Sequence, residues 1–253
     1  MKTRYRLGLA ASALGLVGFG ALMLAAPAAA QELNFNLGGG EGSSTGQILR
    51  LVALLTILSV APGILVVVTS FTRIVVVLSL LRSALGLQQT PPNTVIVSLA
   101  LFLTAFVMGP TLERAYNDGI APLIAEQITE EQAFERTVAP LREFMLLQVR
   151  DGDLQLFMDM SKAAPIASPE ETPLRALIPA FLVSELRRAF EIGFLIFVPF
   201  LIIDMVISGI LLSMGMMMLP PITVSLPFKL IFFVLVDGWY LLAGALVQSF
   251  GQT

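Results

Sequence analysis

The feature that most constrains this chain is a pair of long apolar stretches near its carboxyl end, residues 192–212 and 222–247. Each is long enough for a helix that crosses a bilayer, which needs about 20 mostly apolar residues. The connecting residues 213–221 carry no charge and end in two prolines. Such a turn lacks the basic residues of an ordinary cytoplasmic loop. The pair therefore predicts a membrane-embedded helical hairpin whose tip is covered by other protein.

The composition of the whole chain agrees with a membrane protein. Of its 253 residues 56% are hydrophobic and only 13% are charged, whereas soluble domains carry roughly 25% charged residues. The mean hydropathy is +0.86. The net charge of −3 and the lack of a basic cluster argue against a nucleic-acid partner. Because the chain has no histidine and no cysteine, disulfides, thiolate nucleophiles and histidine metal sites are excluded.

The amino terminus, residues 1–30, is predicted to be a cleavable signal peptide. Basic residues precede a long apolar run, and three alanines at 28–30 stand directly before Gln31, as small-x-small cleavage sites require. The alternative is an uncleaved first membrane helix. Residues 31–46 are polar and rich in glycine and serine, which predicts a flexible extracytoplasmic lead-in.

Residues 47–109 form a first hydrophobic helical section. The apolar stretch 48–68 is long enough to cross the bilayer and should be kinked at Pro62. A later apolar helix over residues 95–108 is expected to be capped by Asn93 or Thr94.

Two arginines lie between these apolar stretches. Arg73 and Arg82 have no acidic neighbour in the sequence. If the lead-in lies outside the cytoplasm, this segment faces the cytoplasm, where basic residues are enriched. The sequence thus predicts a cytoplasmic, positively charged loop at this point.

Residues 110–184 form an acidic section, in which acidic side chains outnumber basic ones. We expect it to be periplasmic and to hold amphipathic helices. Within it, residues 130–149 place apolar side chains at helical spacing, namely Phe134, Val138, Leu141, Met145 and Val149. Residues 185–253 then form a second hydrophobic hairpin. The predicted fold class is an all-α membrane protein of four long hydrophobic helices, in two helical hairpins, with an inserted amphipathic-helical periplasmic section.

Short runs spread over nearly the whole mature chain carry a family resemblance. They are residues 70–74 (SFTRI), 91–93 (PPN), 179–186 (PAFLVSEL), 214–221 (MGMMMLPP), 226–229 (LPFK) and 237–239 (DGW). Together they resemble the FliP family of flagellar export-gate proteins, which is related to the SctR-type subunits of virulence injectisomes. The predicted leader favours the flagellar branch.

The resemblance implies a pentameric ring with FliQ and FliR subunits, beside FlhA and FlhB, in the bacterial inner membrane at the flagellar basal body. Such a ring forms the channel through which unfolded flagellar subunits leave the cytoplasm. It implies no enzymatic activity and no cofactor. An SctR-type injectisome subunit is the alternative. A small-solute transporter is a more distant one, since it should show inverted repeats, and we find none in the sequence.

The resemblance also gives the hairpin turn a role. Met214, Met216, Met217 and Met218 would form a gasket, because flexible thioether chains can close a pore and still deform around a passing polypeptide. The alternative is that these methionines simply fill apolar gaps.

The same resemblance implies roles for four further residues. Arg150, Glu185 and Lys229 would form a charge network between neighbouring subunits, although Lys229 could instead snorkel near a helix end. Phe144 matches a position near the plug of the closed channel. An aromatic residue on an amphipathic helix is otherwise usually part of the core.

Two aspartates in the apolar stretches suggest a rival function. Asp204 and Asp237 could act as the paired carboxylates of an intramembrane aspartyl protease. Their neighbours lack the Gly-x-Gly-Asp pattern of those enzymes, which disfavours this interpretation.

Overall fold

The structure is a computed structural model that describes residues 51–52, 55–56, 59–60, 63–64, 66–161, 168–216 and 218–251. The chain divides into two units, Met1–Leu54 and Leu55–Thr253, and the helices α3 to α10 all belong to the second. The predicted signal peptide, the lead-in and the kink at Pro62 lie outside the described residues.

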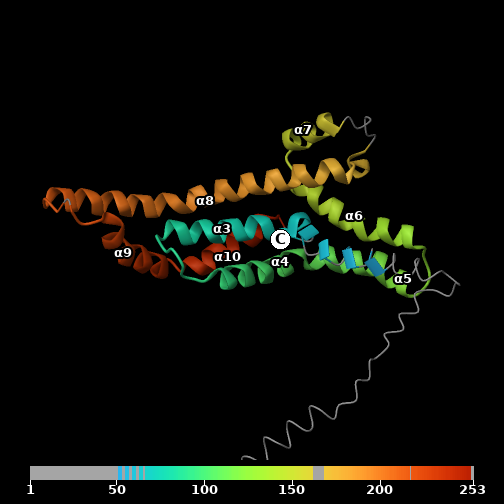
Figure 1. Cartoon of the computed structure of the whole chain (residues 1–253), viewed down its shortest axis with the longest axis horizontal. Helices are drawn as coiled ribbons and strands as arrows, with labels where there is room; N and C mark the ends of the chain where they lie inside the picture. Colours follow the sequence, from blue (N-terminus) through green and yellow to red (C-terminus); the bar gives the residue numbers. More distant parts are fainter. Residues whose placement is uncertain are drawn as a thin grey trace, which may run out of the picture. The chain divides into compact units, whose positions relative to one another are not determined.

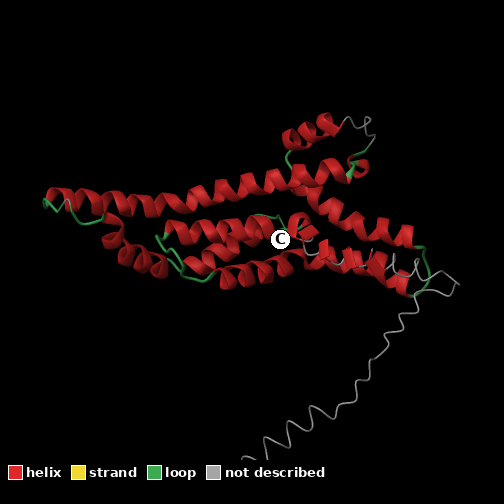
Figure 2. Ribbon diagram, viewed as in Figure 1, coloured by secondary structure: helices red, strands yellow, loops and turns green. Residues whose placement is uncertain are grey.

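All regular secondary structure in the described residues is helical (Figure 2), so the all-α class is confirmed. The elements in chain order are α3 Phe71–Ala84, α4 Asn93–Ala115, the π-helix η1 Tyr116–Ile120, α5 Ala121–Ile124, α6 Glu130–Gln148, α7 Asp151–Ser161, the 3-10 turn η2 Pro169–Glu171, α8 Leu174–Ser213, α9 Pro221–Leu235 and α10 Gly238–Gln248.

Two continuous helical segments of the described chain are long and apolar enough to cross a membrane. They are Asn93–Ile124, which joins α4, η1 and α5, and Leu174–Ser213, which is α8. The pair α9 and α10 makes a third candidate, bent by 65°. The expected helix over residues 48–68 lies mostly outside the described residues, so four long helices remain a prediction, as does the periplasmic position of the acidic section.

The longest described helix, α8, spans the predicted boundary between the acidic section 110–184 and the hydrophobic section 185–253. It runs without a break over 40 residues and through Pro179 and Pro199. At 1.5 Å per residue it is about 60 Å long, roughly twice the thickness of the hydrocarbon core. The predicted boundary between Ser184 and Glu185 therefore falls inside one continuous helix rather than in a linker.

The last apolar stretch is broken into two helices at Asp237. This residue has a left-handed backbone (φ 50), which ends α9 and begins α10 in a new direction. At Gly238 an added Cβ would lie 2.2 Å from the ring of Phe233. The bend therefore relies on a glycine that lets the aromatic ring approach the backbone.

Helix α3 lies between α8 and α4 (Figure 1), and it packs against both of them. Its side chains Ile74, Val77, Leu78 and Leu81 are almost completely buried. They pack against a core that includes Phe181 of α8 and other apolar side chains of α4 and α10. The segment expected to be a loop is thus a buried helix, which corrects that part of the prediction. Its cytoplasmic side stays a prediction.

Helix α6 begins and ends almost where its periodicity predicts. Thr129 and Gln132 form a reciprocal capping box at its start, which satisfies backbone groups that a helix leaves unpaired. The expected apolar face is partly wrong, because Phe134 is exposed while Ala133 is buried. Small residues face η1 here, so that the two helices can approach closely.

The expected side-chain cap of α4 is also wrong. The helix begins at Asn93, and neither this residue nor its neighbour Pro92 makes a side-chain cap. Instead the Nη1 group of Arg82 donates to the Oδ1 atom of Asn93 at 2.6 Å. The asparagine therefore fixes the connection between α3 and α4 rather than the helix start.

Candidate functional site

The first buried polar cluster is built around Arg73 on α3. Its side chain and that of Glu185 on α8 are completely buried and form a salt bridge. The Nε group donates to Glu185 Oε2 at 2.8 Å, and Nη2 donates to Glu185 Oε1. The pair is bidentate, the geometry in which arginine binds a carboxylate most strongly.

The remaining donors of this guanidinium reach two other parts of the chain. Nη1 donates to the carbonyl oxygen of Ser249 at 2.9 Å and to its Oγ at 3.0 Å, and Nη2 donates to Gln148 Oε1 at 3.0 Å. Gln148 in turn donates to the carbonyl oxygen of Phe250 at 3.1 Å. The guanidinium also lies 3.8 Å from the ring centroid of Phe250. All five N–H groups of Arg73 are thus used.

This arrangement ties distant segments of the chain together. A buried ion pair contributes little net stability, but it penalises any packing that would separate its partners. Here four segments must meet for Arg73 to be satisfied: α3, α6, α8 and the residues after α10. Within the described ranges, no group of acidic side chains is suited to holding a metal ion.

Sequence reasoning missed this cluster because Arg73 and its partner are 112 positions apart. A signal was present, since a charged residue inside an apolar helix usually has a partner within the bundle.

The second polar cluster joins α8, α9 and the end of α3. The Nζ group of Lys229 donates to Asp204 Oδ2 at 2.6 Å and to the carbonyl oxygen of Ala84 at 3.1 Å. Ser225 donates to the other carboxylate oxygen of Asp204 at 2.5 Å. Lys229 is buried, so it does not snorkel to the surface in this structure.

This second cluster also bears on the protease alternative. Both oxygens of Asp204 accept hydrogen bonds from α9, and Asp237 is an exposed residue at the bend between α9 and α10. A carboxylate that is already paired with a lysine is not available to share a proton with a second aspartate. The geometry does not support a carboxylate dyad.

The three residues of the predicted intersubunit network have separate surroundings within one chain. Glu185 pairs with Arg73 and Lys229 pairs with Asp204. The backbone N–H of Arg150 donates to Ser184 Oγ at 3.1 Å, which holds the junction of α6 and α7 against α8. A network between subunits stays a prediction.

Phe144 lies in the core of the chain. Its ring centroid is 5.9 Å from that of Phe181, in an edge-to-face pair, and 6.2 Å from that of Phe250, in a stacked pair. The Phe250 ring also contacts Arg73, so Phe144 supports the first polar cluster. Its position near a plug stays a prediction.

The methionine turn, residues 214–218, ends α8 in a defined geometry. Gly215 has a left-handed backbone (φ 72), its N–H donates to the carbonyl of Leu212, and the N–H of Met216 donates to that of Leu211. These bonds form a Schellman motif. Met214 is 65% exposed and Met218 is 99% exposed, and Met217 lies outside the described residues. A folded turn thus presents apolar, uncharged side chains to the surroundings.

Comparisons with known proteins point to one family. The chain matches the FliP family over residues 54–246. It is 58% identical over 230 residues to the flagellar biosynthetic protein FliP of Caulobacter vibrioides, covering 91% of this chain and 86% of that protein. It is 55% identical over 212 residues to the protein of the same name from Rhizobium meliloti, covering 83% and 86%. It is 52% identical over 210 residues to that of Bacillus subtilis, covering 83% and 95%.

Proposed function

The chain belongs to the FliP family, and from that premise we propose that it is a subunit of the flagellar protein export gate. It is a membrane-associated component of the flagellar export apparatus. In the proposed assembly it forms part of the channel through which unfolded flagellar subunits cross the bacterial inner membrane.

The observation that carries this proposal is the methionine turn at the end of α8. A 40-residue helix places an exposed, uncharged turn far from the acidic helices α6 and α7, at the opposite end of the bundle (Figure 1). In a ring of such chains the turns would meet at the axis. Thioether side chains can pack against one another without charge and yield to polypeptides of any sequence.

Exposed apolar side chains support membrane insertion and assembly. Phe102 and Phe106 on α4 and Phe194 on α8 are each about 70% exposed or more. A single chain in water would leave them in contact with solvent, so lipid or other subunits should cover them.

Replacing Met214, Met216, Met217 and Met218 together with alanine is expected to increase ion leak through the assembled gate, because the shorter side chains no longer fill the axis. The measurement is the ion conductance of membranes that contain the gate. Met160→Ala on α7, also an exposed methionine, is the matched control and should leave conductance unchanged. Unchanged conductance in the fourfold variant would refute the seal.

We further propose a pentameric ring with FliQ and FliR, with FlhA and FlhB as neighbours. The native mass of the detergent-extracted chain, expressed alone and then with these partners, tests this arrangement. We expect a discrete ring that grows when the partners are present. A monomer or dimer in both preparations would contradict it.

Lys229→Ala is expected to lower the yield of that ring if Lys229 contacts a neighbouring subunit. Because Lys229 also pairs with Asp204 within the chain, the matched control is Asp204→Asn, which removes the internal partner and keeps the lysine. Ring yield is compared at equal amounts of folded protein. A ring that forms equally well in both variants would exclude the intersubunit role.

Two alternatives remain less supported. An SctR-type injectisome subunit would share the fold, but the named relatives are flagellar proteins. A small-solute transporter would bind its substrate between inverted repeats, and the element order of the described chain supports no such symmetry.

A further inference from the structure

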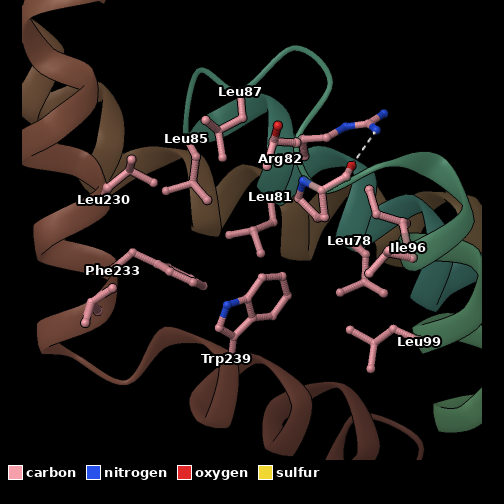
Figure 3. Close-up of a pocket in the computed structure, with 14 residues that line it drawn as sticks. Leu78, Leu81, Arg82, Leu85, Leu87, Ile96, Leu99, Leu230, Phe233 and Trp239 are labelled. Carbon is pink, nitrogen blue, oxygen red and sulfur yellow. Dashed lines mark hydrogen bonds between the residues drawn. The ribbon is translucent and has the colours of Figure 1, made fainter. Parts of the chain in front are cut away.

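A cavity of about 480 Å³ lies between the end of α3, the connection to α4, and the bent pair α9 and α10. Figure 3 shows the side chains that surround it, with Leu85 and Leu230 on one side, Ile96 on the other, and Trp239 opposite Arg82. Its volume is within the range of sites that bind small molecules. Arg82 is the one charged residue among the 14 that line it.

Arg82 lies at the edge of this cavity, and no salt bridge in the described residues neutralises its positive charge. Its Nη1 group donates to Asn93 Oδ1 at 2.6 Å and to the carbonyl oxygen of Pro91 at 3.3 Å. Neither acceptor carries a formal charge. Among the residues that the structure describes, no carboxylate forms a salt bridge with Arg82. The cavity therefore combines an apolar interior with an uncompensated cation at its edge.

The walls of the cavity come from helices that are candidates for crossing the membrane, namely α4 and the bent pair. An apolar lining of this kind favours apolar ligands over water. In a bilayer the available apolar ligand is a lipid acyl chain. Basic sites between membrane helices bind the head groups of anionic lipids.

We propose that this cavity binds an anionic phospholipid, with an acyl chain beside Trp239 and the phosphate on Arg82. Arginine suits this role because its fixed set of donors matches a phosphate group. A helix of a partner protein fits less well. The cavity has room for only about one turn of an α-helix. If that turn were apolar, the charge of Arg82 would have no counter-ion.

The experiment uses Trp239, which is the one tryptophan of the chain. Brominated acyl chains quench tryptophan fluorescence on contact. The full-length protein is placed in phosphatidylcholine vesicles that contain increasing fractions of brominated phosphatidylglycerol or, separately, of brominated phosphatidylcholine. We expect half-maximal quenching at a roughly fivefold lower fraction of the anionic lipid, about the contribution of one cation near an anionic membrane.

Variants test whether the preference for the anionic lipid depends on Arg82. Arg82→Gln should remove it, whereas Arg82→Lys should keep part of it because the charge remains. Arg187→Gln on α8 is the matched control, since Arg187 is exposed and pairs with Glu191, and it should keep the full preference. Helical circular dichroism confirms that each variant is folded.

Three outcomes would overturn the proposal. Equal quenching by both lipids in the unaltered protein would mean that Trp239 merely meets bulk lipid. No quenching by either lipid, in protein shown by flotation to be inserted, would mean that protein fills the cavity. Loss of the preference on adding inorganic phosphate would assign Arg82 to the free anion. The proposal rests on membrane insertion, which flotation tests separately, so its failure is distinguishable from a failure of the proposed function.

Discussion

Replacing Glu185 with alanine is expected to lower the free energy of unfolding by about 3–5 kcal/mol, because a buried charge is left without its counter-ion. The guanidinium of Arg73 is completely buried and uses both carboxylate oxygens of Glu185. Its other acceptors, Gln148 and Ser249, carry no charge. The change is measured by titrating the protein in mild-detergent micelles with dodecyl sulfate and following its helical circular dichroism.

The matched control is another acidic residue on the same helix. Glu191 pairs with Arg187 at the exposed surface of α8, so Glu191→Ala should cost less than about 1 kcal/mol. A double variant, Arg73→Met with Glu185→Leu, should recover part of the loss, since apolar residues can replace a buried ion pair. Equal costs for Glu185→Ala and Glu191→Ala would show that the buried pair does not hold the bundle together.

Replacing Gly119 with alanine is expected to destabilise the protein by about 1–3 kcal/mol, the usual cost of overpacking a tight contact. An added Cβ would lie 2.8 Å from the backbone nitrogen of Thr137 and 2.9 Å from the carbonyl oxygen of Ala133. These are backbone atoms of α6, so they can yield only if α6 moves away from η1. The same dodecyl sulfate titration measures the effect.

Gly244→Ala on α10 is the comparison for this change. A Cβ there would meet nothing within 4 Å, so the variant should gain about 0.5–1 kcal/mol from better helix propensity. The two substitutions thus have opposite expected signs. A gain in stability from Gly119→Ala would contradict the close approach of η1 and α6.

Local patterns in the sequence predict part of this fold well. The spacing of apolar residues over 130–149 locates α6 almost to the residue. The uncharged run 213–221, which ends in two prolines, locates the turn after α8. In both places the signal and the structure it specifies lie within a few neighbouring residues.

Contacts between distant residues explain what the sequence could not reveal. Arg73 appears unpaired along the chain, but Glu185 lies beside it in space. Phe134 fits an apolar face by spacing, yet the close contact of Gly119 with α6 turns another face inward. The change in charge density near Ser184 suggested a boundary there, but α8 continues through this position. Charge density alone does not indicate whether a helix continues.

The hydrogen bonds of Arg73 also set an order of events during synthesis. Its partners lie at positions 148, 185 and 249, the last of them 176 residues later in the chain. Helix α3 is made early, but its arginine cannot be fully bonded until Ser249 has left the ribosome. A polypeptide that lacks Ser249 would keep a partly bonded charge in its core, so the packing of α3 depends on a residue that is made long after it.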